Sequence, residues 1–307
     1  MRYHLATLRG AQRFTHTAAV AAAAALAVNM FTTTSAFAEF EIQETQVEKG
    51  EKELEYRGAV HWGFPKRERE AGEEAAEENE EGGALEEEEE GEFLRQSHDF
   101  EFQWGITNRW MFSTALSADE PLDEDFDLSS VELELQYEVI ERQGNGFGLA
   151  LIGAYGFATR GGEADELELA PFFEVASGKF LFTGNPIFTA QVGEHRETDS
   201  LGFEYGWRAQ YNVAKKWAMG AEMFGEIEDL SNAGSFEDQQ HSIGPTLFYA
   251  PGGFGDDDDD NGNGNGDDKR KVGGPPEMEL SFNAGVQFGL TDFTSDTALK
   301  FQGTLEF

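Results

Sequence analysis

Residues 131–139 read VELELQYEV, and apolar and polar side chains alternate along this stretch without a break. In a β-strand, successive side chains point to opposite faces, so the apolar residues share one face and the acidic and amide residues share the other. A helix would spread both sets around its whole circumference. The stretch is therefore predicted to be a strand with one apolar face and one acidic face.

The same alternation recurs along most of the chain. Most of these segments have about the 9–11 residues that a tilted strand needs to cross a bilayer. The twelve segments predicted as strands are 53–65, 93–106, 109–118, 130–141, 146–158, 166–176, 180–193, 200–213, 217–227, 241–250, 277–289 and 296–307.

The connections between these segments alternate in length. Short turns are predicted at 107–108, 141–146, 177–179 and 214–216, and longer loops at 66–92, 119–129, 159–165, 194–199 and 228–240. This alternation, with aromatic residues near strand ends, is typical of an outer-membrane barrel and is not expected of a soluble sandwich. The sequence therefore predicts an all-β fold, a transmembrane up-and-down antiparallel β-barrel of about twelve strands.

The N-terminus is predicted to be a secretory signal peptide over residues 1–38. Three arginines precede an Ala-rich apolar run, and Ala36-Phe37-Ala38 offers small residues at a cleavage site. A membrane anchor is the alternative, but the run is short for the about 20 residues of a helical span. We expect residues 39–52 to form a periplasmic lead-in, or an additional strand, and 53–307 to form the barrel, located in the outer membrane of a Gram-negative bacterium.

The composition limits the partners of the chain. The 60 Asp and Glu residues against 22 Lys and Arg give a net charge of -38, which disfavours a nucleic-acid partner. The chain has no cysteine, which excludes disulfides and thiolate chemistry. Outer-membrane lipid and small solutes or cations are the expected partners.

The polar faces of the strands are predicted to point into the barrel lumen. Closely spaced carboxylates in a narrow lumen favour cations over anions, so the sequence predicts a cation-preferring pore or passive transporter. A plugged, non-conducting structural or surface barrel acting through its acidic loops is the alternative. The residues predicted to line the pore are Glu53, Glu55, Arg57, Asp99, Glu101, Glu132, Glu134, Glu138, Glu168, Glu204, Arg208, Glu222 and Glu226.

Two short motifs and the C-terminus support a family resemblance. Residues 105–110 read GITNRW, 289–292 read GLTD, and the chain ends in the alternating stretch FQGTLEF at 301–307. A terminal aromatic on such a strand resembles the signal recognised by the barrel-assembly machinery, which is therefore an expected partner. With the twelve segments and the signal peptide, the chain resembles the outer-membrane family named for the meta pathway of phenol degradation (MetA-pathway type). That resemblance implies uptake of aromatic compounds.

Two charged tracts lie outside this pattern. Residues 66–92 contain 14 acidic side chains and are predicted to form a solvated acidic loop, with a lid or cation-gathering vestibule as the alternative. Residues 251–276 form an Asp-rich loop, predicted to be a polar linker. One register of this loop resembles a calcium-binding EF-hand loop, with Asp257, Asp259, Asn261 and Asp268 as candidate Ca²⁺ ligands. No other cofactor is expected.

No catalytic constellation is apparent in the sequence, so we expect a protein that is not an enzyme. His241 and Ser242 are adjacent, and on a strand their side chains face opposite ways, which makes a poor base–nucleophile pair. An outer-membrane hydrolase remains the third alternative.

Overall fold

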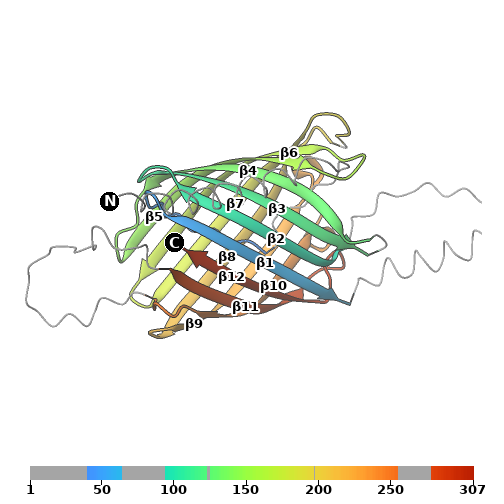
Figure 1. The fold of residues 1–307 in the computed structure, drawn as a ribbon. Helices are drawn as coiled ribbons and strands as arrows, with labels where there is room; N and C mark the ends of the chain where they lie inside the picture. Colours follow the sequence, from blue (N-terminus) through green and yellow to red (C-terminus); the bar gives the residue numbers. More distant parts are fainter. Residues whose placement is uncertain (1–39, 64–93, 123–124, 197, 255–277) are drawn as a thin grey trace, which may run out of the picture. The chain divides into compact units, whose positions relative to one another are not determined.

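The computed structural model describes residues 40–63, 94–122, 125–196, 198–254 and 278–307. Within these ranges, twelve antiparallel strands form one closed barrel, in which each strand pairs with its neighbours in the chain and β1 pairs with β12 (Figure 1). The strands are β1 Lys52–Trp62, β2 Leu94–Gly105, β3 Trp110–Pro121, β4 Asp127–Ile140, β5 Gly146–Ala158, β6 Asp165–Ser177, β7 Phe180–Val192, β8 Gly202–Ala214, β9 Trp217–Ile227, β10 Gln240–Tyr249, β11 Glu279–Gly289 and β12 Thr297–Glu306. The predicted fold class is confirmed.

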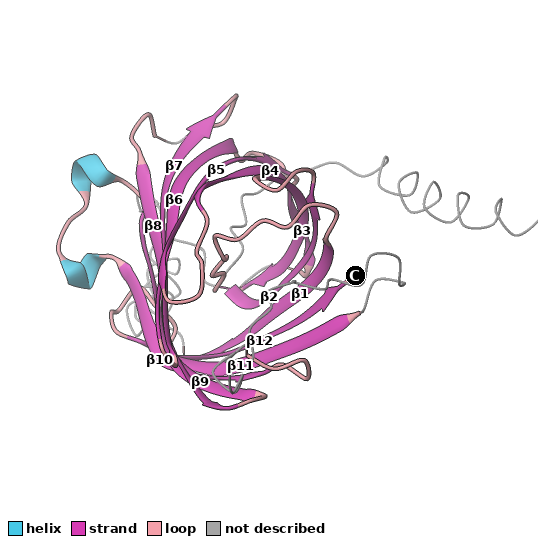
Figure 2. Cartoon of the chain, turned by 90° about the vertical axis from the view of Figure 1, so that its left-hand side faces the viewer, coloured by secondary structure: helices cyan, strands magenta, loops and turns pink. Residues whose placement is uncertain are grey.

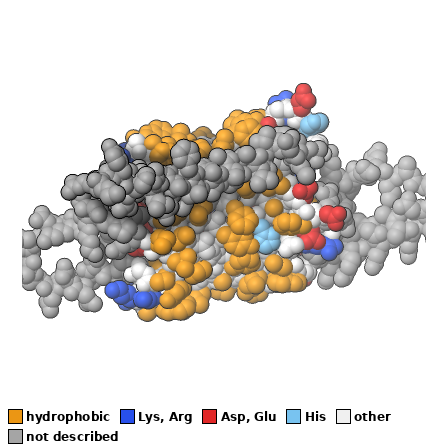
Figure 3. Space-filling model, in the orientation of Figure 1, with side chains coloured by type: hydrophobic (Ala, Val, Ile, Leu, Met, Phe, Trp, Pro, Cys, Tyr) orange, Lys and Arg blue, Asp and Glu red, His pale blue; other side chains and the backbone are white. Residues whose placement is uncertain are grey.

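The barrel is apolar outside and polar inside. On β4, Leu133 and Leu135 are 41% and 44% exposed, whereas Glu134 and Gln136, which alternate with them, are buried. Among the side chains coloured in Figure 3, hydrophobic ones dominate the outer surface, with charged groups near its ends. This arrangement follows from the alternation in the sequence, because a closed sheet places every second side chain in the lumen.

The strand ends differ from the prediction mainly between β3 and β4. The sequence predicted a loop over 119–129, but β3 continues to Pro121 and β4 begins at Asp127. The register shifts between Ser117 and Ala118, which is typical of a β-bulge. Beyond the shift, Ala118 pairs with Leu128 and Asp119 with Asp127.

Short 3-10 turns, and no longer helices, accompany the strands in the described part of the chain. These are η1 Leu230–Asn232 and η2 Phe236–Asp238, both between β9 and β10. Asp229 caps η1 by accepting hydrogen bonds from the backbone N–H groups of Ser231 and Asn232. No helix among the described residues is long and apolar enough to span a membrane.

The segment that precedes β1 lies inside the ring of strands. Ile42 is 5% exposed and Thr45 is fully buried, although neither belongs to a strand. Figure 2 looks into the ring of strands and shows loop segments within it. The described part of the predicted lead-in over 39–52 that precedes β1 is residues 40–51, and several of its polar groups hydrogen-bond to inward-facing side chains of the strands. We call residues 40–51 the lumen segment.

Several predictions fall outside the described residues. These are the signal peptide at 1–38, the acidic loop at 66–92, most of the Asp-rich loop at 251–276, and the candidate calcium ligands Asp257, Asp259, Asn261 and Asp268.

Candidate functional site in the barrel lumen

A buried arginine organises the centre of the lumen. The guanidinium of Arg57 donates to Glu55 at 2.5 Å and to Glu101 at 2.9 Å, and pairs with Glu41 at 2.9 Å. Glu55 and Glu101 face each other across β1 and β2, and Glu41 comes from the lumen segment. Arg57 thus joins the barrel wall to the lumen segment and offsets part of the carboxylate charge.

A second cluster surrounds Glu222 on β9. Its carboxylate accepts from Arg208 at 2.7 Å, from Lys300 at 2.6 Å and from the Thr246 hydroxyl at 2.6 Å. The ammonium of Lys300 also donates to the backbone carbonyl of Phe40 at 3.3 Å. The negative charge of Glu222 is therefore balanced by two bases. Through Lys300, this cluster also holds the start of the lumen segment.

Further hydrogen bonds fix the middle of the lumen segment to β7 and β4. The backbone N–H of Gln43 donates to Asn185 Oδ1 at 2.7 Å, and Asn185 Nδ2 donates to the Gln43 carbonyl at 3.1 Å. The Gln43 side chain donates to Glu134 at 3.1 Å.

The next residues of the lumen segment bond to β6 and β4. The Thr45 hydroxyl donates to Glu174 at 3.0 Å, and Gln136 donates to the carbonyls of Glu44 and Thr45, both at 3.3 Å. The lumen segment thus replaces its lost hydration with hydrogen bonds to inward-facing side chains on several strands.

Two cavities remain on either side of the lumen segment. The loop-side cavity has a volume of about 890 Å³ and lies where the longer connections meet; the turn-side cavity has about 960 Å³ and lies near the short turns. Glu41 and Gln43 line both cavities. The lumen segment is therefore the constriction between them.

Both cavities are strongly acidic. Among the described residues, eleven carboxyl side chains and one arginine, Arg160, line the loop-side cavity. Nine carboxyl side chains line the turn-side cavity, together with Lys49, Arg142 and Arg208. Arg160 forms an ion pair with Asp119, so its positive charge is already partly neutralised. Carboxyl side chains therefore outnumber bases in both cavities.

The structure brings the predicted lumen residues to the inner wall of the barrel. Glu132, Glu134, Glu168, Glu204 and Glu226 line the loop-side cavity, Glu53, Glu55, Glu138 and Arg208 line the turn-side cavity, and Arg57, Asp99, Glu101 and Glu222 are buried.

The sequence interpretation missed other lumen residues. Glu166 lines the loop-side cavity, and it could have been found because it shares the inward parity of Glu168. Asn185 and Gln287 also face inward, but their alternation signal is weaker because they carry no charge. Glu41 and Gln43 had no usable signal, since the lumen segment is not a strand.

Burial raises the pKa of Glu41 well above its usual range, and the nearby Arg57 guanidinium opposes this rise. One oxygen of Glu41 pairs with Arg57, while Oε1 has no hydrogen-bond partner in the described part of the chain. The carboxyl at the constriction is thus a titratable group with an unused acceptor.

His241 and Ser242 do not contact each other through their side chains. Nδ1 of His241 shares a hydrogen bond with the Tyr205 hydroxyl at 2.9 Å, and Nε2 shares one with Gln239 at 2.9 Å. Both ring nitrogens are therefore engaged by partners other than Ser242, as the strand alternation predicted.

Comparisons with solved structures return outer-membrane proteins at low identity. Pseudomonas aeruginosa OccK7 (OpdD) matches at 9% identity with a TM-score of 0.33, covering 73% of this chain and 57% of that chain. The Acinetobacter baumannii outer membrane protein Omp33 matches at 11% identity with a TM-score of 0.36, covering 85% and 99% of the two chains. LpxR from Salmonella typhimurium matches at 10% identity with a TM-score of 0.34, covering 83% and 99%.

These likenesses carry no conclusion about activity, and the chain spans less than two thirds of the length of OccK7. No protein-family model matches the chain, and no curated protein matches it. The resemblance to the meta-pathway family therefore stays a prediction.

The architecture itself identifies the setting of the chain. A closed antiparallel barrel with an apolar outer surface, a polar interior and no open sheet edge is the β-structure that spans an outer membrane. The predicted location in the outer membrane of a Gram-negative bacterium, in contact with its lipid, is confirmed.

Proposed function

We propose that the chain is an outer-membrane pore or passive transporter for small solutes, with a preference for cations. The observation that carries this proposal is the pair of carboxylate-lined cavities, which approach each other from the two ends of the barrel. In the part of the chain that the structure describes, Glu41 and Gln43 of the lumen segment line both cavities, so this segment lies between them.

Cation preference follows from the charge balance of the lumen. A solute passing through either cavity meets several carboxyl groups for each base. Because the lumen is narrow and its walls have a low dielectric constant, the electric field of these carboxyl groups is concentrated inside it. Anions are disfavoured by the same field, whereas neutral solutes are limited mainly by the width of the constriction. Uptake of aromatic compounds, which the family resemblance implies, remains compatible with the phenyl rings at Phe40 and Phe224.

A non-conducting structural barrel is the second candidate, and the lumen segment is the observation that favours it. Its hydrogen bonds to Asn185, Glu174 and Gln136 hold it across the lumen. In this alternative the segment stays docked and the barrel acts through its external loops.

Solute flux into proteoliposomes separates the two candidates. Liposomes containing the signal-cleaved protein should swell in solutions of small ammonium-bearing solutes faster than in neutral solutes of equal size, and least in carboxylate-bearing ones. Liposomes with inserted barrel that swell no faster than empty liposomes in any solute would support the structural barrel instead.

A further inference from the structure

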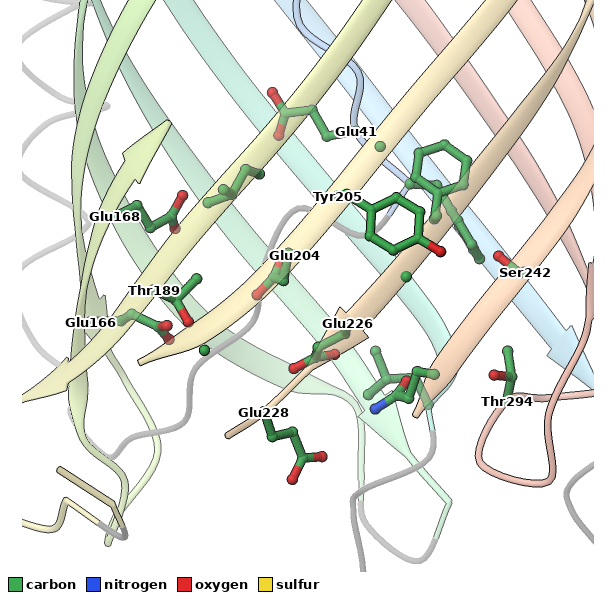
Figure 4. A pocket seen from close by; sticks show the side chains of 18 of the residues that line it. Glu41, Glu166, Glu168, Thr189, Glu204, Tyr205, Glu226, Glu228, Ser242 and Thr294 are labelled. Carbon is green, nitrogen blue, oxygen red and sulfur yellow. The ribbon is translucent and has the colours of Figure 1, made fainter. Parts of the chain in front are cut away.

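The loop-side cavity has one wall on which carboxyl groups are distributed rather than clustered. Glu166 and Glu168 come from β6, Glu204 from β8 and Glu226 from β9 (Figure 4). Glu204 and Glu226 are direct partners in the β8–β9 register. The basic side chains that organise the centre of the lumen, Arg57, Arg208 and Lys300, form ion pairs with Glu55 and Glu222.

The spacing of these carboxyl groups suits separated positive charges. Glu166 and Glu168 lie two residues apart on one strand, or about 6.6 Å along it. Side chains at directly opposed positions such as Glu204 and Glu226 have Cβ atoms about 5 Å apart. No group of carboxyl and imidazole side chains among the described residues could hold a metal ion. A row of ammonium groups on one flexible chain fits this wall better than a single compact ion.

Gln287 provides an independent indication of a ligand. Its side chain lines the same cavity and is 1% exposed, yet neither its amide oxygen nor its amide nitrogen has a hydrogen-bond partner in the described chain. A buried amide without partners is unfavourable, so the site is polar and incomplete as it stands. An ammonium group would donate to the Gln287 oxygen and satisfy it.

Apolar surface lies between these polar groups. Phe172 is buried and Ile187 packs against its cluster, and both line the cavity. Phe40 and Phe224 also line the cavity, and their rings pack edge to face with centroids 5.1 Å apart. Methylene groups of a linear amine would contact these side chains while its ammonium groups reach the carboxylates.

We propose that the loop-side cavity binds linear polyamines, that is, alkyl chains carrying two or more ammonium groups. The carboxyl wall formed by Glu166, Glu168, Glu204 and Glu226 takes the charges, and Gln287 takes one further ammonium group by hydrogen bonding. This inference rests on the proposed cation-preferring pore and names the class of solute that the pore holds.

Calorimetric titration of the folded, signal-cleaved protein with spermidine tests the inference. We expect saturable binding, weakened roughly tenfold by the double variant Glu204→Gln/Glu226→Gln and also by Gln287→Leu, since each removes charge-assisted hydrogen bonds. The matched control Glu53→Gln/Glu138→Gln, on the turn-side cavity, should bind as the wild type does. Butylamine, with one ammonium group, should bind much more weakly.

Absence of saturable spermidine binding would overturn the inference. So would binding by the Glu204→Gln/Glu226→Gln variant that equals that of the wild type, or displacement of bound spermidine by Mg²⁺ at an equal concentration of charge. Mobility of unheated protein on denaturing gels shows whether each variant is folded. Conductance recorded on the same protein separates the two proposals. Cation-selective conductance without spermidine binding removes only the polyamine site, whereas binding without conductance removes only the pore.

Discussion

Arg57 illustrates how a single side chain offsets the negative charge of several carboxylates in the lumen. It is almost fully buried and contacts three carboxylates, Glu41, Glu55 and Glu101, which would otherwise repel one another. We expect Arg57→Gln to lower the free energy of unfolding by about 3–5 kcal/mol, because it leaves buried carboxylates without a counter-charge. Urea unfolding in lipid vesicles, followed by tryptophan fluorescence, measures this change. Arg196→Gln is the control, since Arg196 and its partner Asp199 are solvent-exposed and their pair contributes little; equal losses in both variants would contradict the account.

Individual carboxyl groups on β4 should set ion selectivity. Glu132 and Glu134 line the loop-side cavity and Glu138 lines the turn-side cavity, so this one strand contributes carboxyl groups to both cavities. Replacing all three by Gln should lower the cation-to-anion permeability ratio while the barrel still folds. Asp127→Asn, at the exposed start of β4, is the matched control. Unchanged selectivity in the triple variant would show that the lumen charge does not govern permeation.

The lumen segment is the element on which conduction depends. Deleting residues 40–48 keeps the hydrogen bonds between Gly50, Glu51 and Gly105 that fix the start of β1. The deletion should raise single-channel conductance several-fold, because it joins the two cavities into one path. An inserted deletion variant whose conductance equals that of the wild type would contradict the role of this segment as the constriction.

Docking of the lumen segment should also depend on pH. An exposed glutamate has a pKa of about 4.3, and burial raises the pKa of Glu41 in the docked segment. The docked state therefore retains a proton that the released state loses, so docking is most stable below about pH 4.3 and weakens as pH rises through the raised pKa. Conductance should increase over that interval, and Glu41→Gln should remove this part of the increase. Identical pH profiles for the two proteins would exclude Glu41 as the responsible group.

Strands and lumen segment differ in how far the sequence predicts them. Alternation is a local property, and twelve strands could be placed to within a few residues because each carries its own apolar face. The lumen segment depends on partners far away in the chain, such as Gln43 with Asn185, which are 142 residues apart. The pairing of charges is equally non-local: the sequence indicated that Glu222 and Arg208 face inward, but not that Glu222 meets both Arg208 and Lys300.

Closure of the barrel joins its first and last strands. Lys52 and Phe307 exchange backbone hydrogen bonds of 3.1 and 2.8 Å, and β1 pairs with β12 along their whole length. If the terminal aromatic is also read by the assembly machinery, Phe307→Ala should lower the amount of folded protein in cells more than the yield of refolding in detergent. Phe282→Ala, which removes an exposed aromatic side chain from the neighbouring strand β11, is the control. Equal effects on both yields would assign Phe307 a purely structural role.

Recording the protein without residues 1–38 in a planar bilayer under a KCl gradient tests the proposed pore most directly. We predict discrete conductance steps whose reversal potential lies on the cation-selective side, because carboxyl groups outnumber bases in both cavities. A barrel that inserts into the bilayer and passes no current, or one whose reversal potential is anion-selective, would contradict the proposed pore.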